Sequence, residues 1–311
     1  MQKKYSDLIL TGSISIDRIM NFRGRYQDMI QADKLHVLSL SILIDSLTHS
    51  RGGTGANIAY SSALLGDQPI LLGSVGHDAK AYVDDLSTLG VDTSHVFFSD
   101  LPTPTFTVLT DSDNNQVGGF YPGAMSDISH LSLKPWYDQN PLVVISANDP
   151  LGMDHLVKEC IAHKLDYVYD LGQQVTNITI KQMKLGLSHA KILFVNDYEL
   201  GVICARTGYS KAELEAMIPL VVTTLGKEGT EIAGEIIPAL KNIEVVDPTG
   251  AGDAYRAGFL YGYLRKYDPD TCARLGSVVA SYTISLRGTQ THTFSLAEVK
   301  EKYYSAYGRK L

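Results

Sequence analysis

The chain has 311 residues, of which 44% are hydrophobic and 20% are charged. This composition supplies a sizeable core and excludes wholesale disorder, and the length fits one large domain or two small ones. The formal net charge of −7 argues against a general binder of nucleic acids or anionic membranes. It does not exclude a bound nucleotide, because a local group of backbone N–H donors can hold phosphate in an acidic protein.

The cysteines and the apolar runs indicate the compartment. Cys160, Cys204 and Cys272 are widely spaced, with no Cys-x-x-Cys pair and no nearby histidine ligands. They favour reduced thiols in a cytoplasmic protein over a disulfide or a metal site. No apolar run reaches secretory or membrane-spanning length, so we expect neither a leader nor a membrane segment.

The N-terminal segments predict a buried strand followed by a small accessory sheet. Residues 7–12 form an apolar run that ends at a glycine, which is typical of a buried strand. Residues 13–17 alternate between polar and apolar, and Asp17 ends the polar face. The pattern alone favours a solvated turn for Asp17 over a site in which its carboxylate binds two adjacent hydroxyls. Residues 38–44 also alternate, so we expect an additional strand there.

Helices and glycine turns follow. The glycine-rich turn at residues 51–55 opens a helix predicted from Ala56 to Leu65. This turn lacks the Gly-x-Gly-x-x-Gly spacing and does not follow the first strand directly, so we reject a dinucleotide-binding loop. Residues 69–78 predict a second strand and turn, and residues 79–89 predict a helix that Gly90 ends.

A β-hairpin is predicted near the middle of the chain. Residues 105–110 alternate cleanly, a turn-rich stretch follows, and residues 116–121 return as a strand. Together with residues 36–45, this hairpin would form a lid sheet over a substrate. We expect that lid to be inserted from about residues 15–50 and 101–124, and its exposed edge is a candidate contact for a homodimer.

The second half of the chain alternates between apolar strands and helices. The near-continuous apolar runs lie at residues 142–146, 167–170, 191–195 and 219–224, and helical segments separate them. This pattern predicts a mainly parallel sheet covered by helices on both faces, which is a doubly wound α/β fold. Ligands of such sheets bind beyond the carboxyl ends of the strands.

The most informative stretch spans residues 245–258. Val245 and Val246 suggest the end of a buried strand, and the turn at Gly250-Ala251-Gly252 then lets a ligand approach the backbone closely. From Asp253 onward, apolar residues recur at helical spacing. The unpaired N–H groups and the dipole at such a helix start favour a phosphate, beside which Asp253 could accept a proton from an attacking hydroxyl. An ordinary tight turn with a dipole-stabilised aspartate is the alternative.

The full string from Asp247 to Asp253, Asp-Pro-Thr-Gly-Ala-Gly-Asp, resembles the Asp-x-x-Gly-Ala-Gly-Asp signature of the PfkB (ribokinase-like) family of carbohydrate and nucleoside kinases. The resemblance implies one ribokinase-like α/β domain over residues 1–311, with a small β-sheet lid. It also implies transfer of the γ-phosphoryl group of Mg-ATP to a primary hydroxyl. Asp253 would be the base, and Gly250, Ala251 and Gly252 would stabilise charge on the transferring group.

Two further motifs resemble the substrate-binding signatures of this family. Asp17 matches the aspartate of a Gly-x-x-x-x-Asp pattern that begins at Gly12, where the family binds sugar hydroxyls. Gly53 and Asn57 match Gly-Gly-x-x-x-Asn, in which the glycines admit the sugar and the asparagine bonds a hydroxyl. The resemblance therefore implies that these three residues hold the acceptor.

The remaining motifs concern the nucleotide and its metal ions. Asn196 and Glu199 match Asn-x-x-Glu, which in the family helps to position magnesium and phosphates through water. Thr224, Gly226 and Gly229 resemble its nucleotide-binding turn Thr-x-Gly-x-x-Gly, and no P-loop is present. In the family, the aspartate at position 247 helps to form a monovalent-cation site with the C-terminal turn, so potassium is a possible cofactor.

The acceptor is less strongly indicated than the reaction. Arg256, residues 33–39 and the turn at residues 287–290 resemble the adenosine/nucleoside kinase branch, so a nucleoside such as adenosine is the first choice. A free sugar such as ribose or fructose is the alternative within enzymes. A regulator that binds a sugar or a nucleoside without catalysis is the alternative from another class, although such a protein would not need Asp253.

Overall fold

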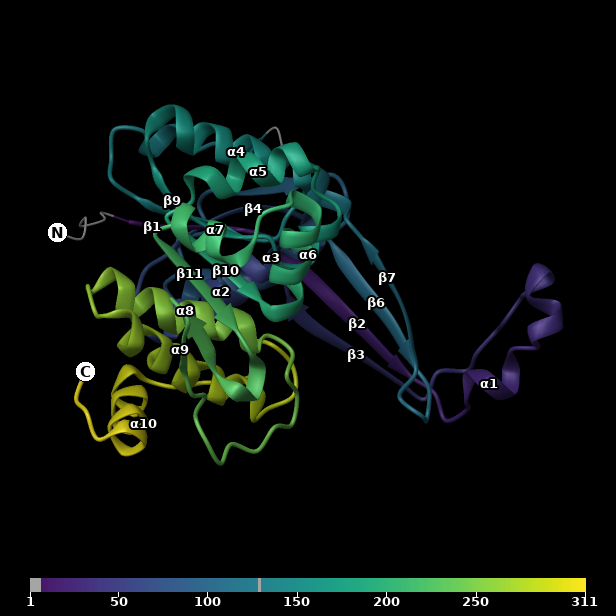
Figure 1. The fold of residues 1–311 in the computed structure, drawn as a ribbon. Coiled ribbons are helices and arrows are strands. Elements are labelled where there is room, and N and C mark those ends of the chain that lie inside the picture. Colours follow the sequence, from purple (N-terminus) through teal and green to yellow (C-terminus); the bar gives the residue numbers. More distant parts are fainter. Residues whose placement is uncertain (1–6, 128–129) are drawn as a thin grey trace.

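The computed structural model describes residues 7–127 and 130–311, and it contains two sheets (Figure 1). The main sheet has nine strands in the order β13-β12-β11-β10-β9-β8-β1-β4-β5. In chain order they are β1 (Leu8–Thr11), β4 (Ile70–Gly76), β5 (Val96–Ser99), β8 (Leu142–Ile145), β9 (Asp166–Asp170), β10 (Ile192–Asn196), β11 (Leu220–Thr224), β12 (Thr230–Ile232) and β13 (Glu235–Ile237). Every pair from β5 to β11 is parallel, whereas β12 and β13 join antiparallel.

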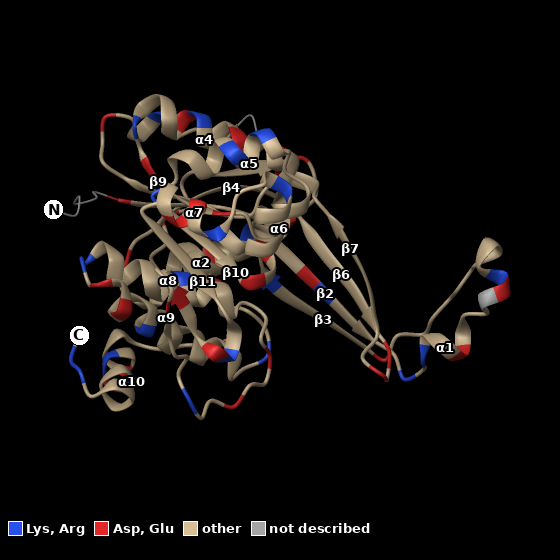
Figure 2. Cartoon of the chain, viewed as in Figure 1, with Lys and Arg blue, Asp and Glu red and all other residues tan. Residues whose placement is uncertain are grey.

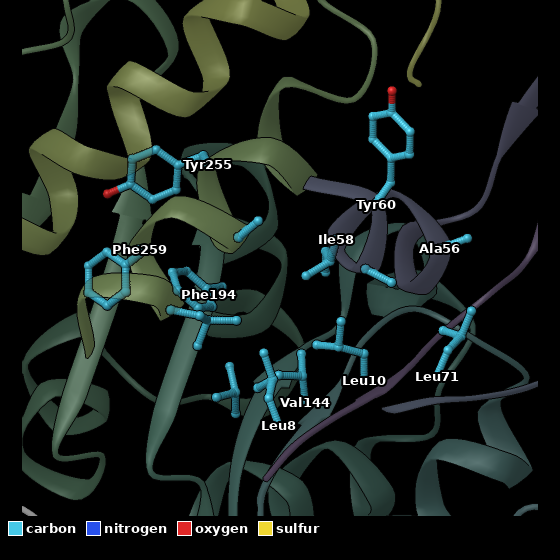
Figure 3. Close-up of a cluster of buried hydrophobic side chains, with 14 of the residues drawn as sticks. Leu8, Leu10, Ala56, Ile58, Tyr60, Leu71, Val144, Phe194, Tyr255 and Phe259 are labelled. Atoms are coloured by element: carbon cyan, nitrogen blue, oxygen red, sulfur yellow. The ribbon is translucent and has the colours of Figure 1, made fainter. Parts of the chain in front are cut away.

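Helices cover both faces of the main sheet, as the near-continuous apolar strands predicted. One face packs against α2 (Thr54–Leu64), α3 (Lys80–Thr88), α8 (Ala251–Leu264) and α9 (Pro269–Ile284), with α10 (Leu296–Tyr307) on the outside of α9. The other face packs against α4 (Pro150–His163), α5 (Ile180–His189), α6 (Asp197–Thr207) and α7 (Lys211–Met217). Figure 3 shows the first of these cores, where Phe194 of β10 meets Phe259 of α8.

The second sheet has four strands and projects from the body in Figure 1. Its order is β3-β2-β6-β7, with β2 (Ser15–Asn21), β3 (Ser46–Gly52), β6 (Thr105–Thr110) and β7 (Gln116–Tyr121). The predicted hairpin is confirmed, because β6 and β7 pair antiparallel over their full length. Since β3 runs directly into α2, the base of this sheet adjoins the helices of the body.

The strand expected at residues 38–44 is wrong. This segment has no regular structure and follows a 3₁₀ helix at Ala32–Val37, while the strand that completes the second sheet is β3. The segment belongs to an arm, residues 22–45, that carries α1 (Tyr26–Met29) and reaches away from the body in Figure 1. Alternation produces a strand only where a partner strand is in reach, and here Leu43 is 90% exposed.

The buried strand expected to end at Val245 and Val246 is also wrong. Both side chains are exposed, and the segment has no regular structure. Its backbone is held instead by the end of α9, because the N–H groups of Val246 and Asp247 both donate to the carbonyl of Ile284. The β-branched pair therefore lies at the surface, and only the turn and helix that follow it match the expectation.

The distribution of charged residues and the character of the helices agree with the composition of the sequence. Acidic and basic residues are interspersed along the chain in Figure 2. Among residues 7–127 and 130–311, no helix combines the length and the apolar character that a bilayer crossing requires.

Candidate active site

The start of α8 forms the predicted anion-binding turn. Gly250 is its N-cap with φ +78°, a left-handed conformation that favours glycine, and the Ala254 N–H donates to its carbonyl at 3.0 Å. The helix begins at Ala251, two residues before the predicted start. The first-turn N–H groups of residues 251–253 have no partner within the helix; that of Ala251 donates to the Pro248 carbonyl at 3.2 Å, and the helix dipole adds partial positive charge at this end.

Asp253 is held by a network that crosses the molecule. The Asn57 side-chain amide donates to Asp253 Oδ2 at 2.8 Å. The Gln290 amide in turn donates to Asn57 Oδ1 at 2.8 Å and to the Tyr82 hydroxyl at 2.5 Å. The Tyr82 hydroxyl donates to the carbonyl of Gly52 at 3.0 Å. The orientation of the Asn57 amide is therefore fixed from both ends.

The electrostatic surroundings make Asp253 a stronger base than a solvated aspartate. Burial raises the pKa of Asp253 from its ordinary value of 3.8 to about 7, although the charge of Arg256 and the hydrogen bond from Asn57 oppose this rise. The negative charges of Asp170 and Glu199 add to it. A carboxyl group that titrates near neutral pH is well matched to proton transfer at that pH.

The residues predicted to hold the acceptor lie where the second sheet joins the body. Asp17 is half-buried in β2, and burial raises its pKa to about 6. A Cβ atom on Gly52 would lie 2.9 Å from Asp17 Oδ2, so the carboxylate sits directly over that glycine. Gly53 has φ +96°, and a Cβ atom there would lie 2.3 Å from the Ser13 carbonyl oxygen, so only glycine fits.

A cavity of about 490 Å³ adjoins Asp253 at the carboxyl ends of the central strands. Its walls include the predicted residues Asn196, Glu199 and Asp253, and also Asp170 and Arg256. These residues come from β9, from the junction of β10 with α6, and from the start of α8. The structure therefore brings Asn196, Glu199 and Asp253 to one cavity, as expected for a sheet of this type, whereas Asp247 and the turns at residues 224–229 and 250–252 are not among its walls.

Asn196 and Glu199 also cap α6. The Glu199 N–H donates to Asn196 Oδ1 at 2.7 Å, and the Asn196 N–H donates to Glu199 Oε2 at 2.9 Å, which is a capping box. Burial, followed by the charge of Asp170, raises the pKa of Glu199. Asn196 and Glu199 thus have a structural role. The Glu199 carboxylate still faces the cavity and offers the kind of oxygen ligand that magnesium prefers.

The predicted nucleotide turn follows β11. Thr224 lies beside Asn196 in the register of β10 and β11, so this strand end adjoins the cavity wall. Gly226 has φ +58° and Gly229 has φ +116°, and both conformations favour glycine. A Cβ atom on Gly229 would lie 2.0 Å from the Ile237 carbonyl oxygen, so the hairpin with β13 is sufficient reason for that glycine.

Asp247 ties the start of the main signature to the C-terminal turn. Its two carboxylate oxygens accept from the N–H groups of Thr249 at 2.9 Å and Gly288 at 3.0 Å. Partial burial raises the pKa of Asp247, but the hydrogen bonds from Thr249 and Gly288 outweigh it, so the net shift is downward. Asp247 is thereby ionised and well ordered, and it braces the turn before α8.

Four residues around Asp253 were given no role in the site from the sequence, although Arg256 and the turn that contains Gln290 were noted as markers of the nucleoside kinase branch. Asp170 and Arg256 line the cavity, while Tyr82 and Gln290 orient Asn57. The signal for Asp170 was present, because it is a charged residue at the carboxyl end of a central strand, as Asn196 is a polar one. Gln290 and Tyr82 gave no such signal, since their role depends on contacts between distant parts of the chain.

Comparison with known proteins assigns the family. Residues 11–295 match the model of the pfkB family carbohydrate kinases. The chain is 32% identical over 310 residues to the nucleoside kinase of Methanothermobacter thermautotrophicus, and the match covers 97% of each chain. The nucleoside kinase of Burkholderia thailandensis in complex with inosine superposes with a TM-score of 0.86 at 30% identity, covering 98% of this chain and 100% of that chain.

The same Burkholderia thailandensis kinase in complex with ADP-inosine superposes with a TM-score of 0.83 at 32% identity, covering 97% of each chain. These likenesses confirm the predicted ribokinase-like fold, with its large, mostly parallel sheet and small second sheet. They extend over nearly the whole chain, and the family model spans both signatures and the C-terminal turn. The chain therefore belongs to the PfkB family of kinases, which transfer a phosphoryl group to a hydroxyl.

Proposed function

We propose that this protein phosphorylates the 5′-hydroxyl of a nucleoside, such as adenosine or inosine, at the expense of Mg-ATP. The observation that carries the proposal is the half-buried Asp253 carboxyl group with its raised pKa, which lies in the first turn of α8 beside a cavity. The relatives support the choice of acceptor, because they are nucleoside kinases, one of which forms complexes with inosine and with ADP-inosine.

The reaction is a direct transfer between two oxygens. The acceptor hydroxyl oxygen forms a bond to the γ-phosphorus, the bond from that phosphorus to the bridging oxygen of ATP breaks, and ADP leaves with the bond electrons. The hydroxyl proton passes to the Asp253 carboxylate. The backbone N–H groups of Gly250, which caps α8, and of Ala251 and Gly252 in its first turn would stabilise negative charge on the transferring group. Because the transition state is loose, positioning contributes more than base strength.

The acceptor would be held where the second sheet joins the body. The Asp17 carboxylate makes no hydrogen bond within the described residues that would compete with a ligand, and it can accept from two adjacent ribose hydroxyls. The Asn57 amide, already directed at Asp253, would add a bond to a hydroxyl. Gly53 would shape this site through its backbone alone, because a Cβ atom there would strike the Ser13 carbonyl oxygen. We infer that the second sheet acts as a lid over this site.

The nucleotide phosphates would lie in the cavity next to α8. Glu199 and Asn196 supply oxygen ligands for magnesium, directly or through water, and the turn at Thr224, Gly226 and Gly229 would contact the nucleotide. When bound with ATP, magnesium neutralises part of the phosphate charge. Potassium near Asp247 stays a prediction, supported by the ionised state of that carboxylate.

We also infer that two copies pair through the second sheet. Its edge strand β7 carries exposed apolar side chains, with Val117 61% and Phe120 47% exposed. An unpaired edge with exposed apolar residues is a typical pairing surface. Sedimentation should show a dimer that Phe120→Glu converts to monomers. A monomeric parent protein would remove this proposal and leave the reaction intact.

The test is a panel of acceptors assayed with Mg-ATP, with and without potassium. Turnover with adenosine or inosine and none with ribose or fructose is the expected result. Turnover with free sugars alone would keep the mechanism and replace the acceptor. Tight binding of a nucleoside without any turnover would indicate the regulator instead.

A further inference from the structure

Arg256 lies in the middle of the candidate site and has no part in the reaction described so far. It stands one turn after Asp253 on α8, and its guanidinium group forms a two-pronged ion pair with Asp170. Arg256 Nε lies 2.7 Å from Asp170 Oδ2, and Nη2 donates to Oδ1 at 2.7 Å. Arg256 is 9% exposed and Asp170 is 1% exposed, so the pair is almost completely buried.

Three neighbouring strands hold the pair in position. Asp170 ends β9, and its Oδ2 also accepts from the hydroxyl of Ser146, just after β8, at 3.0 Å. The ring of Phe194 on β10 lies 5.6 Å from the Arg256 guanidinium carbon. Nη2 is hydrogen-bonded to Asp170, and Nε lies in ion-pair contact with it but makes no hydrogen bond within the described residues. Nη1 is not among the nitrogens that contact Asp170 and is left to point elsewhere.

Nη1 lies against the anion-binding turn. A Cβ atom on Gly252 would be 2.7 Å from Arg256 Nη1, so the guanidinium occupies the space that a side chain at position 252 would fill. Gly252 therefore admits this group to the first turn of α8, whose N–H groups face the same region. Arg256 also borders the cavity together with Asn196, Glu199 and Asp253.

A purely structural role explains this arrangement poorly. Burying two charges takes both out of water, and well-packed apolar residues usually stabilise a core at least as well. Three carboxylates, those of Asp170, Glu199 and Asp253, surround one arginine, so the site keeps a cation next to the base at the cost of desolvation. Arginine geometry suits the planar, multidentate recognition of phosphate oxygens.

We propose that Arg256 is a catalytic residue whose Nη1 contacts the transferring phosphoryl group, and that Asp170 is a positioning residue that aims it. This inference rests on the proposed kinase function and assigns a role within the same site. As bonds to the γ-phosphorus form and break, charge gathers on its oxygens, and a pre-aimed guanidinium stabilises that charge without taking or giving a proton. Asp170, bonded to Ser146, keeps the guanidinium from turning toward Asp253.

The experiment uses Arg256→Met, Arg256→Lys and Asp170→Asn, with Arg265→Lys as a matched control. Arg265 is the C-cap of the same helix and pairs with Asp67 at 2.8 Å, outside the cavity. Steady-state kinetics with inosine give kcat and KM, and thermal unfolding reports folding. Calorimetry gives the ratio of affinities for Mg-AMP-PNP and Mg-ADP, which reports a contact to the γ-phosphate for any acceptor.

We expect the substitutions at Arg256 to weaken only the interactions with the γ-phosphate. Arg256→Met should lower kcat roughly 10²–10³-fold and reduce the AMP-PNP to ADP affinity ratio at least about tenfold. Arg256→Lys should lower kcat about tenfold or more, because an ammonium group cannot hold Asp170 and reach the phosphate together. Asp170→Asn should lower kcat with the KM for inosine unchanged, and Arg265→Lys should match the parent.

The opposite results are equally clear. If kcat and the affinity ratio stay within about twofold of the parent in both Arg256 variants, the pair is a structural brace and the proposal is wrong. If Arg256→Met does not fold, Arg256→Lys decides alone by the same criterion. If the parent phosphorylates no nucleoside, the proposed function fails, and the affinity ratio still decides whether Arg256 contacts the γ-phosphate.

Discussion

Replacement of Asp253 by asparagine should impair catalysis and stabilise the folded protein at the same time. Burial raises the pKa of Asp253 from 3.8 to about 7. At about 1.4 kcal/mol per pKa unit, this rise corresponds to about 4 kcal/mol of unfavourable energy for the charged form in the folded state. Because the side chain is only half-buried, we expect roughly half of that, about 2 kcal/mol, to be recovered on substitution.

The sign of the pH dependence follows from the raised pKa. Between pH 4 and pH 7 the folded state binds more protons at Asp253 than the unfolded chain, so the parent loses this stability as the pH rises through 7. An asparagine at this position does not ionise, so the variant does not lose this stability as the pH rises. Asp253→Asn should therefore be more stable than the parent by about 2 kcal/mol at pH 8 and by roughly 40% of that at pH 5.

Two assays test the reasoning together. Urea denaturation at pH 5 and pH 8 gives the free energy of unfolding, and initial rates give kcat and kcat/KM. Asp253→Asn should lower kcat by roughly 10²–10⁴-fold with nucleotide binding largely intact. In the parent, kcat/KM should fall about tenfold per pH unit below pH 7. Unchanged turnover would remove Asp253 as the base, and an equal stability difference at both pH values would refute the effect of burial.

Three further predictions concern the frame of the site. Gly53→Ala should lower the free energy of unfolding in denaturant by about 3 kcal/mol or more, because the new Cβ atom would strike the Ser13 carbonyl oxygen. Gly66→Ala is the control: its φ is +88° but nothing lies within 4 Å of the new Cβ atom, so it should lower that free energy by only about 1 kcal/mol. Burial lowers the pKa of His292 from 6.5 to about 4, so the parent should lose about 3 kcal/mol of stability as the pH falls from 6.5 to 4, a slope that His292→Gln should remove. Glu199→Gln keeps a residue that can cap α6 but loses the charge, so the KM for Mg-ATP should rise about tenfold with little change in Tm; a large fall in Tm with an unchanged KM would make Glu199 a cap alone.

Local patterns predicted the parts of this protein that depend on local physics. The turn at residues 250–252 and the helix after it were read correctly, because a positive φ favours glycine and the helical period is visible in one segment. The parallel sheet followed from apolar strands separated by helices. The strand predicted at residues 38–44 is wrong because that prediction was also local. Alternation shows which side chains would share a face of a strand, but not whether a partner strand lies within reach.

The contacts that organise the site could not be predicted in the same way. Asn57 and Asp253 are 196 positions apart, and Asp170 and Arg256 are 86 apart, so no periodicity relates them. The resemblance to a kinase family supplied the base and the anion turn residue by residue. It left Arg256 as a marker of one branch, and only the folded arrangement shows its guanidinium beside Gly252.

The measurement that tests the central claim most directly is identification of the product formed from Mg-ATP and inosine by mass spectrometry and ³¹P NMR. We expect inosine 5′-phosphate, one ADP for each product molecule, and at least roughly a hundredfold less of both with Asp253→Asn. Phosphorylation of ribose with none of inosine would contradict the assignment of the acceptor. A product formed equally well without the Asp253 carboxylate would contradict the mechanism.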